Sequence, residues 1–191
     1  DKTGTITKGQ PEVVSVIPLS PFDEATLLQY AASIEQSSEH PLARAIVDKA
    51  KTNQAITLLK TIDFDAITGQ GVSAKVNNKP VLLGNQRLMS SHSLSLNTLL
   101  EQSDQLAELA QTPMFIAIDG QMAGIISVAD PIKADSKTAI AQLKAMGIRV
   151  TMMTGDNQKT ADAVAKQVGI DHVLAEVLPE DKAKQGKALK A

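Results

Sequence analysis

The first seven residues, Asp1-Lys2-Thr3-Gly4-Thr5-Ile6-Thr7, combine a carboxylate with a lysine, hydroxyl groups and a glycine. A carboxylate can act as a nucleophile and form a covalent intermediate, which divides one difficult step into two easier ones. Lysine and threonine supply charge and hydrogen-bond donors, and the backbone around a glycine can approach a phosphate closely. This pattern favours phosphoryl chemistry at Asp1. The alternative is an ordinary polar loop.

Two segments near the end of the chain could assist the same chemistry. Thr154-Gly155-Asp156-Asn157 follows a predicted strand at 148–153, and open α/β sheets bind ligands at the carboxyl ends of their strands. Alone, this segment could equally be a turn and a helix cap. Lys182, in Pro179-Glu180-Asp181-Lys182, could neutralise developing phosphate charge. A lone lysine more often lies on a solvated face.

The segment Ser38-Glu39-His40-Pro41-Leu42-Ala43 predicts the start of a helix. Proline is tolerated at the first helical position, which places His40 at the N-cap and Glu39 just before it. An imidazole can stack on adenine or hydrogen-bond to it, and a carboxylate can accept a hydrogen bond from the adenine amino group. The alternative is a histidine that caps a helix without any ligand.

Two glycine-containing segments complete the set of candidates. Gly69-Gln70-Gly71-Val72 is a G-x-G loop, and Gly84-Asn85 follows a predicted strand. Glycine lets the backbone approach a nucleotide closely. Each segment by itself would be an ordinary turn or strand end, so the nucleotide interpretation depends on their occurrence together.

Together these motifs resemble those of the P-type ATPases. The first seven residues match the phosphorylation motif of that family at every position, and T-G-D, P-E-D-K and Asp130-Pro131-Ile132-Lys133 resemble its later segments. The S-E-H-P-L segment resembles the signature of the heavy-metal ATPases. Glu39 before His-Pro-Leu, together with Gln36, is more similar to copper exporters than to zinc, cadmium or lead exporters.

This resemblance implies an ATP-hydrolysing metal pump with an aspartyl-phosphate intermediate, and ATP and Mg²⁺ as cofactors. The implied catalytic residues are Asp1, Lys2, Thr3, Thr154, Gly155, Asp156 and Lys182, with Asp1 and Thr3 as Mg²⁺ ligands. The implied ATP-binding residues are Glu39, His40, Gly69, Gly71 and Asn85. The implied partners are transmembrane and actuator domains of the same polypeptide, at the cytoplasmic face of a membrane.

Composition excludes several other classes. The 191 residues carry a formal net charge of −2, which gives no support for nucleic-acid binding or for attraction to anionic lipid. The absence of cysteine rules out disulfides and thiolate metal sites. The three histidines have no metal-ligand spacing. No apolar run approaches the roughly 18 residues of a membrane helix.

The elements that must position these residues fall into two modules. Hairpins around Asn77-Asn78 and Asp119-Gly120 predict an antiparallel sheet with flanking helices over 11–128, an inserted nucleotide-binding domain. Alternating strands and helices over 129–191, together with 1–10, predict a partial phosphorylation domain with a doubly wound parallel sheet. The resemblance implies the haloacid dehalogenase-like fold for the phosphorylation domain.

Several family motifs are missing, and this leaves alternatives open. No G-D-G-x-N-D motif follows Lys182, no T-G-E loop occurs, and no apolar strand precedes Asp1. We therefore expect a fragment cut at both ends, which alone acts as a non-catalytic ATP-binding module. A pump for zinc, cadmium, lead or cobalt is an alternative for the parent. A soluble phosphatase of the same superfamily is disfavoured because Thr3 stands where such enzymes carry an aspartate.

Overall fold

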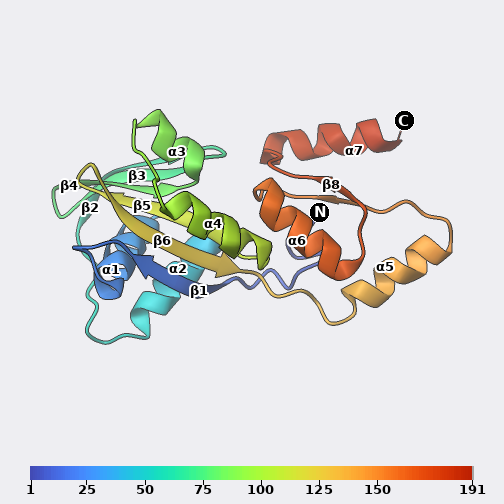
Figure 1. The fold of residues 1–191 in the computed structure, drawn as a ribbon, viewed down its shortest axis with the longest axis horizontal. Coiled ribbons are helices and arrows are strands. Elements are labelled where there is room, and N and C mark those ends of the chain that lie inside the picture. Colours follow the sequence, from blue (N-terminus) through green and yellow to red (C-terminus); the bar gives the residue numbers. More distant parts are fainter. Residues whose placement is uncertain (191) are drawn as a thin grey trace.

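Two sheets of different kinds organise the chain in a computed structural model that describes residues 1–190 (Figure 1). The larger sheet is antiparallel and has six strands in the order β1-β6-β5-β4-β3-β2. Its strands are β1 (Glu12–Pro18), β2 (Thr61–Ile67), β3 (Gly71–Val76), β4 (Lys79–Gly84), β5 (Thr112–Ile118) and β6 (Gln121–Ala129). The predicted antiparallel sheet is therefore confirmed.

Both predicted hairpins are confirmed, and their turns explain their sequences. Asn77 and Asn78 adopt φ angles of 51° and 65°, and Asp119 and Gly120 adopt 54° and 76°. A two-residue turn with positive φ at both positions matches the right-handed twist of the strands that it joins. Asparagine, aspartate and glycine tolerate this conformation better than other residues.

Helices cover both faces of the large sheet. One face packs against α1 (Glu24–Glu35) and α2 (Pro41–Lys51), and the other against α3 (Gln86–Ser91) and α4 (Leu99–Glu108). Side chains alternate between the faces of a strand, so Ile116 joins the first core and Phe115 joins the second. Burial on both faces explains why β5 is apolar along most of its length.

The second module is a strand-helix-strand unit with a helix on each side of it in the sequence. Its elements are α5 (Ser136–Ala145), β7 (Thr151–Met153), α6 (Gln158–Val168), β8 (His172–Leu174), the 3₁₀ turn η1 (Pro179–Asp181) and α7 (Lys182–Lys190). The two strands pair in parallel, Thr151 with His172 and Met153 with Leu174. Ile6 from the start of the chain is buried in this core beside Met152 and Val164, which joins the first residues to this module.

Two details differ from the sequence prediction. The expected strand at 148–153 begins only at Thr151, because Ile148 donates its N–H to the carbonyl of Leu143 and so completes the C-terminal cap of α5. Ile148 is consequently 45% exposed rather than buried. Strand β2 was not predicted, since a bulge at Asp63, with φ 56°, interrupts the alternation that would have indicated it.

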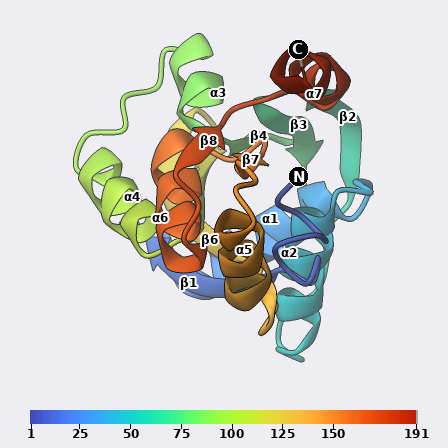
Figure 2. The same ribbon diagram turned by 90° about the vertical axis from the view of Figure 1, so that its right-hand side faces the viewer.

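The modules touch at several places, which include the crossings between them and the faces of α4 and α6. The crossings between them run side by side, where Thr7 bridges Ile132 and the Asp130 carboxylate accepts hydrogen bonds from Thr7 Oγ1 at 2.6 Å and Gln10 N at 3.1 Å. Helix α4 also lies against α6 in both views of the ribbon (Figures 1 and 2), with an ion pair of 2.8 Å between Asp104 and Lys159.

Candidate functional site

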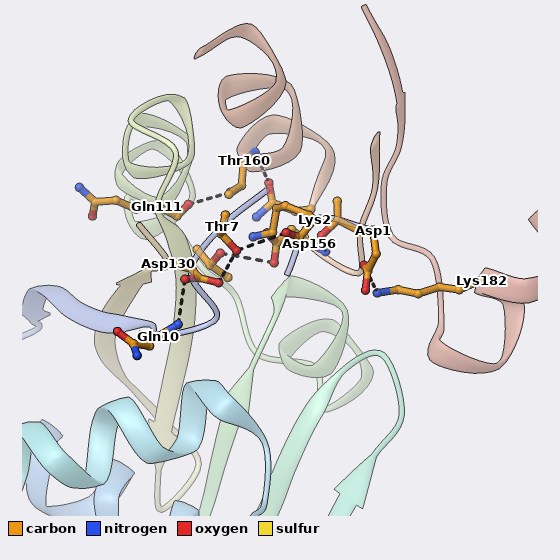
Figure 3. Close-up of polar contacts among 12 residues, drawn as sticks. Asp1, Lys2, Thr7, Gln10, Gln111, Asp130, Asp156, Thr160 and Lys182 are labelled. Carbon is orange, nitrogen blue, oxygen red and sulfur yellow. Dashed lines mark hydrogen bonds and ion pairs between the residues drawn. The ribbon is translucent and has the colours of Figure 1, made fainter. Parts of the chain in front are cut away.

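Asp1 lies at the carboxyl end of β7. The backbone N–H of Lys2 donates to the carbonyl of Met153, the last residue of β7, at 3.0 Å. The Asp1 carboxylate forms an ion pair of 2.7 Å with Lys182 Nζ, and the two side chains are 47% and 31% exposed (Figure 3). The structure thus brings a partly exposed carboxylate and a lysine 181 residues away to the edge of the sheet where α/β folds bind ligands.

Lys2 and Asp156 form a second, buried ion pair, which lies on the other side of Asp1 from Lys182 (Figure 3). A buried charge is tolerated only when it is paired and hydrogen-bonded. The second carboxylate oxygen of Asp156 is 3.5 Å from Thr112 Oγ1, at the start of β5 in the other module. This pair therefore fixes the first loop against β7 and reaches the large sheet.

The residues around Asp156 are held by the backbone. Thr154 is buried, donates its N–H to Leu174 at 2.9 Å, and accepts the N–H of Asp156 on its side-chain oxygen at 3.1 Å. Gly155 is exposed, and a Cβ there would lie 3.4 Å from the carbonyl of Val177. Thr3 is exposed in the turn that contains Gly4, whose φ is 76°.

The candidate adenine-binding residues lie on the other module. His40 is the N-cap of α2, as predicted, and its Nδ1 accepts the N–H of Leu42 at 3.1 Å. Partial desolvation lowers the pKa of His40, and the nearby Asp156 carboxylate acts in the opposite direction. The imidazole is therefore neutral at pH 7, with the proton on Nε2. Glu39 lines a hollow beside the first crossing, next to Gln10 and Arg44.

Gly69, Gly71 and Asn85 lie close together, where β3 begins and β4 ends. Asn85 caps α3 by accepting the N–H of Leu88, and its amide donates to the carbonyl of Gly69 at 2.7 Å. Gly69 has a φ of 74° in the turn before β3. A Cβ at Gly71 would lie 2.2 Å from the carbonyl of Leu83. Packing between β3 and β4 is by itself enough to require glycine at position 71.

Two residues of the second module lie near candidate nucleotide residues of the first. The His40 imidazole lies close enough to Asp156 for the carboxylate to affect its pKa. The side chain of Leu178, in the second module, lies over Gly69 in the first. Asp156 and Leu178 of the second module therefore lie near His40 and Gly69 of the first, far from them in the sequence.

The family model for haloacid dehalogenase-like hydrolases matches residues 1–191, the whole chain. This chain belongs to the haloacid dehalogenase-like hydrolases. Its relatives in this family include the copper-exporting P-type ATPase of Bacillus subtilis, 45% identical over 96% of this chain, and the copper-transporting ATPase 1 of Rhizobium meliloti, 43% identical over 100% of it. The predicted resemblance to heavy-metal P-type ATPases is confirmed. The chain spans 23% of the length of each of these relatives.

Solved structures of two heavy-metal ATPases share the fold of the chain. The catalytic domain of the CPx-ATPase CopB-B is 27% identical, with a TM-score of 0.74 over 100% of this chain and 64% of that domain. A zinc-transporting PIB-type ATPase is 34% identical, with a TM-score of 0.66 over 100% of this chain and 30% of that protein. The predicted haloacid dehalogenase-like fold is therefore confirmed.

One residue of this haloacid dehalogenase-like chain was missed by the motif search. Glu35, the last residue of α1, is only 7% exposed, and burial raises its pKa to about 7. The carbonyl of Glu35 accepts the N–H of Ser38 at 2.9 Å, just before Glu39 and His40, and a strongly shifted pKa marks a carboxyl group as a candidate functional group. The helical spacing Leu28, Ala31, Ala32 and Glu35 places this carboxylate on the apolar face, and that spacing is the signal that could have found it.

The same family resemblance implies Mg²⁺, so the available ligands matter. Within residues 1–190, no group of three or more histidine, cysteine, aspartate or glutamate side chains could hold a metal ion. Mg²⁺ is usually bound by one or two carboxylates together with substrate phosphates, and the exposed carboxylate of Asp1 can supply one such ligand.

Among residues 1–190, no helix is long and apolar enough to span a bilayer.

Proposed function

We propose that this chain binds ATP and is phosphorylated on Asp1, as the nucleotide-handling part of a P-type ATPase that exports a heavy-metal cation, namely Cu(I). The observation that carries the proposal is the Asp1 carboxylate at the end of β7, paired with Lys182, which follows the turn whose Leu178 contacts Gly69 of the other module. The names of the copper-exporting relatives support the cation. The CopB-B catalytic domain, described as changing conformation upon nucleotide binding, supports ATP as the ligand.

In the proposed reaction, an oxygen of Asp1 attacks the γ-phosphorus of ATP in line. The bond from that phosphorus to the oxygen bridging the β-phosphate breaks, and ADP leaves with the electron pair. Lys182 neutralises charge that develops on the transferring group, and the Thr154 hydroxyl and Gly155 amide donate hydrogen bonds to it. Lys2, through its ion pair with Asp156, holds the loop that carries the nucleophile.

Mg²⁺ would be held by Asp1 and Thr3 together with the phosphates, and it would supply further charge neutralisation. At the other end of ATP, His40 would donate from Nε2 to adenine, because its Nδ1 already accepts the N–H of Leu42. Glu39, Gly69, Gly71 and Asn85 complete the proposed pocket. Glu35 is added to it as a buried carboxyl group whose backbone carbonyl accepts the N–H of Ser38, just before Glu39 and His40.

The remaining proposals concern the longer protein. We propose that transmembrane and actuator domains accompany this chain in one polypeptide, with the chain at the cytoplasmic face of the membrane. We propose that the chain by itself binds ATP without transferring phosphate. A zinc pump is the second candidate, favoured by the 34% identity to the zinc-transporting PIB-type ATPase.

The test uses the full-length protein in membranes, with ATP radiolabelled at the γ-phosphate. Acid-stable label should form in the wild type, and Asp1→Asn should abolish it because an amide cannot serve as the nucleophile. The matched control is Asp171→Asn, at an exposed carboxylate whose pKa is lowered by Lys144 beside β8. Persistent labelling of Asp1→Asn would disprove the assignment. Stimulation of labelling by Zn²⁺ and not by Cu(I) would identify zinc, instead of copper, as the exported cation.

A further inference from the structure

Leu178 occupies the segment that connects the end of β8 to Lys182. This segment is tied to the site on one side by its backbone, since Glu176 N donates to Asp156 O at 2.9 Å and Val177 N to Thr154 O at 3.1 Å. Directly afterwards, Asp181 N donates to Leu178 O at 2.9 Å and closes the turn η1. Lys182 follows and reaches Asp1. The position of Leu178 is therefore coupled through a short, hydrogen-bonded turn to the position of the active-site lysine.

The side chain of Leu178 contacts the other module. A Cβ placed on Gly69 would come within 2.7 Å of Leu178 Cδ2, so the leucine methyl occupies the space that a side chain at position 69 would need. The carbonyl of Gly69 is held by Asn85 at 2.7 Å, which fixes the surface that Leu178 meets. One apolar side chain thus connects the proposed nucleotide loop to the turn that carries Lys182.

This contact differs from ordinary core packing. Leu178 belongs to none of the three buried clusters formed by the described residues, and it is only half-buried. Its truncation should therefore leave the fold intact, unlike the truncation of a core leucine. The contact joins the two modules in addition to the two crossings, the α4–α6 face and the approach of Thr112 to Asp156.

We propose that Leu178 is a positioning residue for phosphoryl transfer. When the modules close on ATP, packing of Leu178 on Gly69 sets the η1 turn and thereby places Lys182 against Asp1. This inference rests on the proposed function, because it assumes that Asp1 is phosphorylated. Glycine at position 69 is required by the positive φ of 74° there, and a side chain at this position would also displace the Leu178 methyl group.

The test measures phosphoenzyme formation in single-turnover experiments on the full-length protein, with ATP binding measured separately. Leu178→Ala should slow phosphorylation at saturating ATP about tenfold through misplacement of Lys182. The Kd for ATP and the Tm should stay unchanged. Leu178→Met, which keeps an apolar side chain of similar reach, should restore most of the rate. The matched control is Leu109→Ala, at a leucine that is 66% exposed at the end of α4, and its rate should equal that of the wild type.

The other outcomes are equally decisive. If Leu178→Ala phosphorylates at the wild-type rate, the positioning role is overturned. It is also overturned if the slower rate comes with a proportionate rise in the Kd for ATP or with a lower Tm. These results leave labelling of the wild type intact. Absence of acid-stable label from the wild type contradicts the proposed function instead, and the positioning role then fails with it.

Discussion

At the scale of single residues, the site is built from opposite charges that neutralise one another in the absence of substrate. Lys182 pairs with Asp1 and Lys2 with Asp156, and each pair joins segments more than 150 positions apart. The Asp1 pair is partly exposed, so an incoming phosphate can compete for the lysine. The Asp156 pair is buried, and breaking it would leave an uncompensated charge. We therefore expect the exposed pair to take part in the proposed reaction and the buried pair to support the loop.

His40→Gln should weaken ATP binding and leave the fold intact. The variant loses the proposed Nε2 donor to adenine, and one such contact corresponds to roughly a tenfold rise in Kd. The measurement is an ATP titration by calorimetry, with and without Mg²⁺. His92→Gln, at the end of α3 where the ring contacts Leu88 O, serves as the control. If the His40 variant and the wild type bind ATP with equal affinity, His40 does not contact the nucleotide.

Glu35→Gln should change how stability depends on pH. The folded-state pKa of Glu35 is raised from 4.5 to about 7 by burial. The folded state therefore binds the Glu35 proton more tightly than the unfolded state does. The contribution of this proton to stability is fully present below pH 4.5 and is lost as pH rises through about 7. The variant avoids this loss, so its stability relative to the wild type should rise by about 3 kcal/mol between these pH values. Chemical denaturation across this range measures it.

Glu108→Gln, at the exposed end of α4, controls for the removal of one negative charge. If the free energies of unfolding of Glu35→Gln and the wild type differ by the same amount at every pH tested, Glu35 ionises normally in the folded protein.

At the scale of elements, α3 and the turn before β3 depend on one side chain. Asn85 accepts the N–H of Leu88 with its oxygen and donates to Gly69 O with its amide nitrogen. The first bond starts the helix and the second shapes the proposed nucleotide loop. The sequence pair Gly84-Asn85 is therefore more than the end of a strand.

Two substitutions separate these functions of Asn85. Asn85→Ser keeps a good N-cap but is too short to hold the Gly69 carbonyl, so we expect about fivefold weaker ATP binding with unchanged stability. Asn85→Ala should lose both, with a further cost of about 1 kcal/mol in the free energy of unfolding. Calorimetric titration and urea denaturation measure the two effects. Wild-type affinity in Asn85→Ser would show that the amide bond to Gly69 does not shape the pocket.

The elements were largely predictable from local chemistry, and the exceptions have local causes. Turn residues at 77–78 and 119–120, and His40-Pro41 at a helix start, were found because each requires a particular backbone conformation. Strand β2 was missed because its bulge at Asp63 removes the alternation. Glu35 belongs to no motif, since only its burial in the folded chain distinguishes it from an ordinary helix-terminal glutamate. The contact of Leu178 with Gly69 has no local signal, since it depends on how the modules meet.

At the scale of the whole molecule, Asp130 holds the two crossings together. Its carboxylate accepts from Thr7 on the first crossing and from the backbone of Gln10 beside it. Lys8 N also donates to Pro131 O at 2.8 Å. Motion of one module relative to the other must therefore bend this paired segment instead of two independent strands.

Asp130→Ala should loosen the paired crossings. Hydrogen bonds to a charged group contribute about 1.5–3 kcal/mol each, so amide hydrogen exchange at Lys8 and Gln10 should become at least about tenfold faster. Mass spectrometry of exchanged peptides measures this change. Asp135→Ala is the control, because that exposed aspartate makes no side-chain capping bond to α5. Unchanged exchange at Gln10 would mean that Asp130 does not restrain the crossings.

The pairing of Glu12 with Ala129 in the large sheet has a consequence for how such a protein can arise. The first and last residues of the antiparallel module lie next to each other, so the module occupies a single opening in the second module. A complete unit of this kind can be inserted into a surface loop of a host domain without separating the host's own elements. Excision would leave a gap that a short turn could close. A minimal host rebuilt in this way is a tractable goal for protein engineering.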